Sequence, residues 1–519
     1  DFMEEIKKLA SDEFEGRAPA SKGEELTINY LADSFKKLGL KPGNPDGTYF
    51  QKVPLVAYTI EKGAELTVSG AGKSIKLKPG DDYVGWTRRV VDKVYIDADM
   101  VFVGYGVTAP EYGWDDFKEE DVKDKVIVML INDPQLPDEK MFGGRAMTYY
   151  GRWTYKYEQA AAKGAAGCII IHETETAGYP WEVVRNGREG EQFTIADANN
   201  NASLAPVEGW MTFEKAQEIF KLAGLDLMDA KKVALTKEFK PIALNLKASL
   251  SLKNSIRRIE SNNVVAKIEG SDPKLKDEYV IYTAHWDHFG VGKPAKDKPE
   301  DKIYNGAVDN ATGTAGLIEL ARAFTKLPTK RSILFLAVTA EERGLLGSAH
   351  YGANPLYPLT KTVACINTDS MNVNGKTKDI TVVGLGNSTL DDYVKAAATK
   401  QGRSVKPDPE PEKGYFYRSD HFNFAKYGVP ALYTDPGIDY IGKPASFGEE
   451  ARKKYTAEDY HKPSDEVKPD WDLSGSVEDL KLILEVGYEV ANADEIPKWR
   501  DGNEFKARRD KMLAEAGNK

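Results

Sequence analysis

Short apolar runs alternate with stretches of helical periodicity in the second half of the chain. Five such runs predict buried strands: 279–284, 332–338, 363–366, 380–383 and 431–434. Apolar positions at helical spacing over 312–327 predict an amphipathic helix between the first two runs. Strands that alternate with helices favour an α/β fold, in which a mixed, mostly parallel sheet is covered by helices on both faces.

The first half of the chain has a different pattern. Apolar residues at helical spacing over 2–40 predict two helices, the second of which ends at Gly39. From residue 53 to residue 250, short β-like runs dominate, with one helical stretch at 155–163. We therefore expect one domain formed by 1–55 and 255–519, and a β-rich domain inserted at 56–254. A chain of 519 residues is also too long for one ordinary core.

Composition narrows the range of partners. The net charge is −10 and basic residues cluster only in short helical stretches, which argues against nucleic acid or an anionic membrane as the main partner. No apolar run approaches the roughly 20 residues that span a bilayer, so no transmembrane segment is expected. Cys168 and Cys365 lie in apolar runs and are predicted to be buried free thiols. Cysteine usage therefore does not fix the compartment.

Histidines and acids occur at the ends of the predicted strands of the second half and in two of its loops. They are His285, Asp287, Asp309, Glu341, Glu342, Asp369 and His461. Ligand sites in open α/β sheets form at the carboxyl ends of the strands, so we expect these side chains to converge. Three further histidines are interpreted as structural: His172, His288 and His350.

Charge arithmetic favours two zinc ions in this predicted site. Two Zn²⁺ ions carry +4, and three carboxylate ligands with a bridging hydroxide carry −4. A buried site of this kind is near neutral, whereas one metal would leave excess negative charge. The predicted ligands are His285 and Asp369 for one metal, Glu342 and His461 for the other, and Asp309 as the bridge.

Two further acids are assigned to the chemistry rather than to the metals. Glu341 precedes a ligand and points in a different direction, so we expect it to act as the general base and then as proton donor to the leaving amine. Asp287 lies two residues after His285. We expect its carboxylate to accept the second N–H of that imidazole and hold the tautomer.

These residues carry a family resemblance. The segments Ala284-His-Trp-Asp-His288, Gly306-Ala-Val-Asp-Asn310, Thr339-Ala-Glu-Glu342, Asn367-Thr-Asp369 and Tyr460-His-Lys-Pro463 resemble the zinc-ligand motifs of the M28 family of co-catalytic metallopeptidases. The resemblance implies a zinc-peptidase (phosphorylase/hydrolase-like) sheet, two Zn²⁺ per chain and a peptide substrate. The inserted region is similar to a protease-associated (PA) domain, at Gly104-Tyr-Gly-Val-Thr-Ala-Pro110 and Gly164-Ala-Ala-Gly-Cys-Ile-Ile170.

Two tyrosines are candidates for oxyanion stabilisation. The segment Tyr415-Phe-Tyr-Arg-Ser-Asp-His421 resembles the Ser-Asp-His stretch of the family, in which a nearby tyrosine hydroxyl stabilises the tetrahedral intermediate. Tyr415 and Tyr417 both fit that position, and packing is the alternative for each. The family resemblance also implies a cis peptide bond after Asp309.

The leading functional expectation is an aminopeptidase that releases N-terminal residues by attack of a metal-bridging hydroxide. A carboxypeptidase of the glutamate carboxypeptidase II type is an alternative and would need a cationic pocket, for which Arg145, Arg152 and Arg418 are candidates. A glutaminyl cyclase-like enzyme would hold one zinc. A receptor-like protein with an inactive peptidase fold would have lost metal ligands, and none is lost here.

From the resemblance we expect an exported, periplasmic or secreted protein whose signal peptide is not in this chain. The sequence does not predict the oligomeric state.

Overall fold

The computed structural model describes residues 1–61, 63–136, 141–188, 190–294 and 299–517. The chain divides into two compact units. Unit 1 comprises Asp1–Pro54, Glu260–Pro409 and Arg418–Lys519, and unit 2 comprises Leu55–Ile259 and Glu410–Tyr417. Within the described residues, no helix is both long and apolar enough to cross a membrane.

Unit 1 is built on a mixed sheet in which parallel pairs predominate. The strands are β1 (Lys41–Pro42), β13 (Ile242–Ile268), β14 (Tyr279–His285), β17 (Ser332–Val338), β18 (Thr362–Asn367), β19 (Asp379–Val383), β20 (Ser404–Pro407) and β21 (Ala431–Asp435). Their order is β1–β13–β17–β14–β18–β21–β19–β20, and β17–β14, β14–β18, β18–β21 and β19–β20 are the parallel pairs. This arrangement confirms the predicted fold class.

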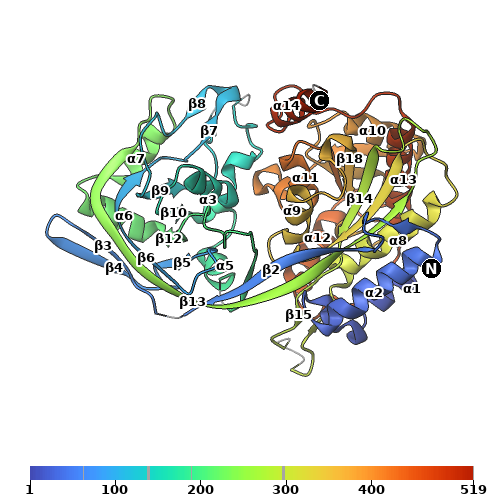
Figure 1. Cartoon of the computed structure of the whole chain (residues 1–519), viewed down its shortest axis with the longest axis horizontal. Coiled ribbons are helices and arrows are strands. Elements are labelled where there is room, and N and C mark those ends of the chain that lie inside the picture. The colour runs from blue at the N-terminus through green and yellow to red at the C-terminus, as the bar shows by residue number, and fades with distance from the viewer. Residues whose placement is uncertain (62, 137–140, 189, 295–298, 518–519) are drawn as a thin grey trace. The chain divides into compact units, whose positions relative to one another are not determined.

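Helices cover both faces of this sheet. One face packs against α1 (Phe2–Leu9), α2 (Lys22–Lys37), α8 (Gly313–Phe324), α10 (Leu390–Lys400) and α13 (Ser474–Asn492). The opposite face packs against α9 (Leu346–Ala353) and α11 (His421–Lys426). Figure 1 shows α8 and α13 on one side of β14 and β18, and α9 and α11 on the other. Because both faces are covered, β14, β17 and β18 are buried at every position.

Alternation along β14 shows how the core of unit 1 is filled. Val280, Tyr282 and Ala284 point into one apolar cluster with Ile6 and Leu9 of α1. The Tyr282 hydroxyl donates to the carbonyl of Ile483 in α13, so the ring is buried without an unsatisfied polar atom. The predicted N-terminal helix pair is thus present and forms part of this core.

Unit 2 has its own sheet and two apolar clusters. Its parallel strands are β6 (Lys93–Phe102), β9 (Val126–Leu130), β10 (Gly167–His172) and β12 (Val207–Thr212), in that order. Antiparallel pairs extend the sheet: β6 with β13, β13 with β3 (Leu66–Gly70), β3 with β4 (Lys73–Leu77), and β12 with β5 (Tyr83–Trp86). The helices α3 (Trp153–Ala162), α6 (Phe213–Leu222) and α7 (Leu227–Ala234) pack against it.

The segment 410–417 differs from the predicted division, which placed it in the peptidase domain. Within unit 2, the Met147 N–H donates to the carbonyl of Pro411, and the Arg145 guanidinium lies 2.9 Å from the Glu412 carboxylate. The ring of Tyr417 contacts that of Tyr149. These contacts join the segment to unit 2 although it is distant in sequence. Cys168 and Cys365 are buried free cysteines, as predicted.

Candidate metal centre

Three neighbouring parallel strands bring the predicted ligands to one edge of the unit 1 sheet. His285 is the last residue of β14 and is in register with Val338, the last residue of β17. Glu341 and Glu342 follow β17, and Asp369 follows β18. The carboxyl ends of parallel strands meet at one edge, so the placement follows from the strand order.

Asp309 comes from the turn of residues 307–312 that precedes α8. The Asp309–Asn310 peptide bond is cis, as the family resemblance implies. The Asp465 carboxylate accepts hydrogen bonds from the backbone N–H groups of Val308 at 3.0 Å and Asp309 at 3.1 Å. The Asn310 side chain donates to the carbonyl of Thr368, next to Asp369. These contacts fix the turn to the strand end that carries another predicted ligand.

The first group of possible ligands surrounds Nε2 of His285. This nitrogen lies 3.2 Å from Asp309 Oδ1, 3.4 Å from Asp369 Oδ1 and 4.0 Å from Glu341 Oε2. The ligand atoms of His285, Asp309 and Asp369 all lie within 4.8 Å of one another. An imidazole and two carboxylates at this spacing are a ligand set that suits zinc.

The second group surrounds Nε2 of His461, which lies 3.2 Å from Asp309 Oδ2 and 3.2 Å from Glu342 Oε2. His461 adopts φ +57° in the loop that follows α12 (Phe447–Glu458). Asp309 thus directs Oδ1 to His285 and Oδ2 to His461. A carboxylate that presents one oxygen to each of two ligand groups has the arrangement of a metal bridge.

The charges of the site call for cations at these two positions. Burial would lower the pKa of His461, but Glu342 and Asp309 raise it to about 10. Burial also opposes the protonation of His285, yet Glu341, Asp369 and Asp309 raise its pKa well above the usual value. The carboxylates therefore hold protons on both imidazoles when no metal is bound. Zn²⁺ would replace that positive charge, so the residues fit two metal ions.

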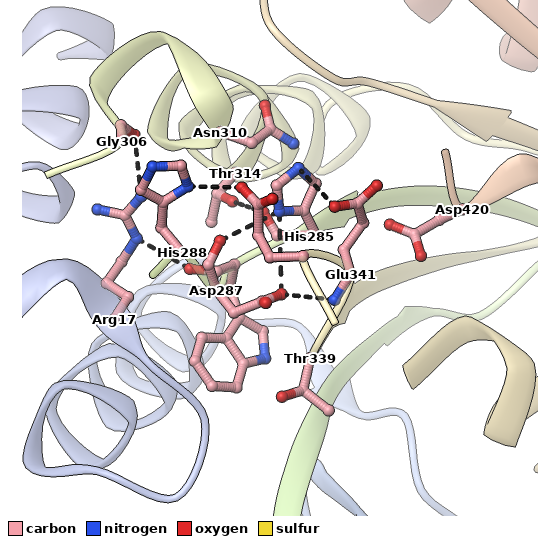
Figure 2. Close-up of polar contacts among 12 residues, drawn as sticks. Arg17, His285, Asp287, His288, Gly306, Asn310, Thr314, Thr339, Glu341 and Asp420 are labelled. Carbon is pink, nitrogen blue, oxygen red and sulfur yellow. Dashed lines mark hydrogen bonds and ion pairs between the residues drawn. The ribbon is translucent and has the colours of Figure 1, made fainter. Parts of the chain in front are cut away.

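Glu341 lies beside this cluster and differs from the ligands in its proton affinity. Burial, followed by the charges of Glu342, Asp369 and Asp420, raises the pKa of Glu341 well above its usual range, although His285 opposes the shift. Figure 2 shows Glu341 with Asp287 and Asp420. Burial raises the pKa of Asp420 to about 7. The site therefore holds more buried carboxyl groups than the charge arithmetic on the ligands alone included.

Asp287 has a different contact from the one predicted. Nδ1 of His285 lies 3.1 Å from the backbone carbonyl of Asp287 and 3.8 Å from its carboxylate, so the hydrogen bond goes to the carbonyl. The carboxylate instead accepts the backbone N–H of Glu341 at 3.0 Å. The backbone carbonyl of Asp287 already accepts the hydrogen bond from Nδ1 of His285. The carboxylate is therefore available for the turn after β17. Burial raises the pKa of Asp287 to about 7.

Several side chains form hydrogen bonds that orient the predicted ligands. The Ser419 hydroxyl donates to Asp369 Oδ2 at 2.7 Å and accepts from Asn367 Nδ2 at 2.7 Å. The Thr314 hydroxyl donates to the carbonyl of His285 at 2.7 Å. Hydrogen bonds of this kind restrict a ligand to one orientation.

The sequence prediction missed two residues of this site. Arg17 is 1% exposed, and its guanidinium donates to the carbonyls of Leu9, Trp286, Asn305 and Gly306 at 2.6 to 2.9 Å. Figure 2 shows Arg17 beside Gly306. His288, which was interpreted as structural, has Nδ1 2.6 Å from Glu342 Oε1. The Glu-Gly-Arg sequence at 15–17 contains no periodic signal, and a lone histidine is weak evidence for a ligand.

Two of the histidines interpreted as structural have other partners. His172 is in unit 2, where Nε2 lies 3.0 Å from the carbonyl of Tyr179. His350 is in α9, and its carbonyl accepts from Asn354. Tyr415 and Tyr417 belong to the segment that clusters with unit 2. Their role at an oxyanion stays a prediction.

Comparisons with known proteins agree with this site. Residues 263–484 match the model of "Peptidase family M28". The chain is 28% identical over 197 residues to aminopeptidase YwaD of Bacillus subtilis, which covers 38% of this chain and 37% of that protein. It is 36% identical over 128 residues to aminopeptidase NAALADL1 of Mus musculus, covering 23% of this chain and 15% of the relative. It is 25% identical over 321 residues to leucine aminopeptidase 2 of Arthroderma otae, covering 59% and 58%.

In each of these relatives the chain spans less than two thirds of the relative's own length. Among solved structures, the aminopeptidase from Aneurinibacillus sp. strain AM-1 aligns over 95% of this chain and 94% of its own, with 18% identity and a TM-score of 0.49. The matched segment 263–484 contains His285, Asp309, Glu341, Glu342, Asp369 and His461. Over this segment the chain is similar to peptidase family M28, and over part of its length it is similar to aminopeptidases.

Proposed function

We propose that this protein is a zinc-dependent exopeptidase that releases N-terminal residues from peptides. The observation that supports it most is the Asp309 carboxylate, whose oxygens lie 3.2 Å from His285 Nε2 and 3.2 Å from His461 Nε2. Two bound Zn²⁺ ions would polarise the scissile carbonyl and lower the pKa of the attacking water. The names of the relatives support an aminopeptidase rather than another hydrolase.

Glu341 moves the proton in this proposal. Its raised pKa suits a carboxyl group that takes a proton from water and returns it to the leaving amine. The hydrogen bond from its backbone N–H to Asp287 fixes the turn that carries it. Asp309, Glu342 and Asp369 would hold the metals, which would supply the positive charge that polarises the scissile carbonyl.

Substitution Glu341→Gln tests this role with little change in shape. We expect kcat on aminoacyl substrates to fall by about 10² to 10⁴, because the base is lost. Zinc content should stay at two per chain, since Glu341 is not a ligand in this scheme. Glu319→Gln on α8 is a matched control away from the strand ends. Full activity of the Glu341→Gln protein, or loss of zinc from it, would exclude the proposed role.

Substrate panels separate the remaining alternatives. Free-amine peptides should be cleaved and N-blocked peptides should not. The reverse preference would indicate a carboxypeptidase, for which Arg145, Arg152 and Arg418 were the candidate carboxylate binders. A zinc content near one per chain would favour a glutaminyl cyclase-like enzyme. A sample that holds two zinc ions per chain and cleaves no peptide would favour a receptor-like protein. We further propose that unit 2 is a PA domain and that the protein is exported.

A further inference from the structure

His288 has contacts that neither the sequence motif nor the proposed mechanism explains. Its ring is fully buried, and Nδ1 lies 2.6 Å from Glu342 Oε1. This short distance indicates a charge-assisted hydrogen bond between the imidazole and the carboxylate. The other oxygen of the same carboxylate, Oε2, lies 3.2 Å from His461 Nε2. The two oxygens of Glu342 therefore face two different histidines.

We propose that His288 is a positioning residue that donates its Nδ1–H to Glu342 Oε1, so that Glu342 binds the second metal through Oε2 alone. This inference rests on the two-metal site proposed above. A glutamate without such a partner can bind zinc through one oxygen or through both. When Oε1 accepts the hydrogen bond from His288, only Oε2 is left for the metal position that Glu342 shares with Asp309 and His461.

The ring of His288 is held in place independently of Glu342. A Cβ on Gly306 would lie 2.6 Å from Cγ and Cδ2 of His288 and 2.3 Å from the carbonyl oxygen of Asp309. The ring thus packs directly on the backbone of Gly306, at φ +53°, a position that only glycine suits. The backbone N–H of His288 donates to the carbonyl of Arg17 at 3.3 Å. A pre-placed donor of this kind can impose an orientation on a carboxylate.

The alternative is that His288 is itself a ligand. The ligand atoms of His288, Asp309 and Glu342 lie within 4.8 Å of one another, and Nε2 of His288 has no hydrogen-bond partner among the described residues. With Nδ1 engaged by Glu342, metal binding would have to use Nε2. An asparagine amide reproduces the Nδ1–H position of histidine, whereas a glutamine amide reproduces the Nε2 position. The two substitutions therefore separate the two roles.

The test measures zinc affinity by chelator competition on the metal-free protein. His288→Ala should weaken binding of one zinc about 10- to 100-fold, the usual effect of losing a partner that orients a ligand, and leave the other zinc unchanged. His288→Asn should recover most of the loss and His288→Gln should not. With Co²⁺ in place of zinc, the visible absorption of one site should change in His288→Ala, because Glu342 is then free to bind through both oxygens.

Controls distinguish this role from a structural one. His350→Ala removes a buried histidine of unit 1 outside the cluster and should leave both zinc affinities unchanged. If His288→Ala does not fold, the comparison of His288→Asn with His288→Gln decides the role. Unchanged zinc affinity in His288→Ala would overturn the inference, as would recovery by Gln and not by Asn. An unaltered protein that binds fewer than two zinc ions would overturn the proposed function as well.

Discussion

At the scale of single residues, the buried guanidinium of Arg17 organises the loops behind the metal centre. It donates to four backbone carbonyls, two of which belong to Asn305 and Gly306 before the Asp309 turn. Burial lowers its pKa to about 10, but the charges of Asp465, Asp287 and other acids oppose the shift. Arg17 thus stays charged at neutral pH and adds a fixed positive charge to an acidic region.

Substitution Arg17→Met is expected to destabilise unit 1 by about 3–5 kcal/mol, because four buried carbonyls lose their donor and the acids lose a counter-charge. Arg17→Lys should recover little of the lost stability, since one ammonium group cannot donate to carbonyls on opposite sides of the guanidinium position. Urea unfolding measures the effect, and Arg322→Met on α8 is the control, because this arginine is partly exposed and pairs with the Glu5 carboxylate. A lysine variant as stable as the unaltered protein would contradict this account.

The sequence indicated which candidate ligands would converge, but it did not indicate the residues that contact them. His285, Glu342 and Asp369 could be identified because each follows an apolar run, and strand ends converge in an α/β sheet. Arg17 could not, because its partners are carbonyls up to 289 residues away, and such contacts leave no pattern in the chain. For Asp287, the sequence indicated a role near His285 but not the atom that contacts it. The backbone carbonyl and the carboxylate of Asp287 can both accept the N–H of that imidazole.

At the scale of elements, hydrophobic pattern predicted short buried strands well and long structures poorly. The run 332–338 coincides with β17, and the helix predicted at 312–327 corresponds to α8. β13 is 27 residues long and was not predicted as one strand. Its residues pair with β6 in unit 2 and with β17 in unit 1, so its burial pattern changes along its length. Local periodicity cannot reveal such a change of neighbours.

The β7–β8 hairpin of unit 2 (Thr108–Ala109 and Trp114–Asp115) provides a prediction about pH. The buried Asp116 carboxylate accepts from the Val107 N–H at 2.9 Å and from Trp114 Nε1 at 2.8 Å. Burial raises its pKa from 3.8 to about 6 despite these hydrogen bonds. The folded state therefore binds this proton more tightly than the unfolded state does. The resulting stabilisation is complete below pH 3.8 and is lost as the pH rises through 6.

Comparison of the unaltered protein with Asp116→Asn isolates this contribution. Their difference in unfolding free energy should fall by about 3 kcal/mol between pH 3.5 and 7, with the unaltered protein favoured at the acidic end. Denaturant titrations across this range measure it, and Asp115→Asn is a neighbouring control whose carboxylate is more exposed. A difference that does not vary with pH would show that the pKa of Asp116 is the same in the folded and unfolded states.

At the scale of the whole molecule, metal binding is expected to stabilise one unit and not the other. All the proposed ligands belong to unit 1. Ligands that bind only the folded state stabilise it, by about 4 kcal/mol when present at 1,000 times their Kd. Removal of zinc with a chelator should therefore lower the unfolding temperature of unit 1 and leave that of unit 2 unchanged.

Calorimetry with and without chelator measures this effect. Tryptophans report on each unit: Trp286, Trp471 and Trp499 lie in unit 1, and Trp86 and Trp210 in unit 2. Single-tryptophan variants would assign each transition to its unit. Equal shifts in both transitions would mean that the units unfold together, and the absence of any shift would count against a metal in unit 1.

The interruption of unit 1 by residues 55–259 has a consequence for biosynthesis. The helices α1 and α2 leave the ribosome before unit 2 does, but their apolar partners in β13, β14 and β17 follow more than 200 residues later. At 5–20 residues per second, translation of the intervening segment takes about 10–40 s. During that time, the strands cannot yet bury the apolar side chains of the helix pair: Ile6, Leu9, Leu31 and Phe35. Nascent chains stalled before and after residue 338 should therefore differ in chaperone binding at this helix pair, and the metal centre can form only after His461 has emerged.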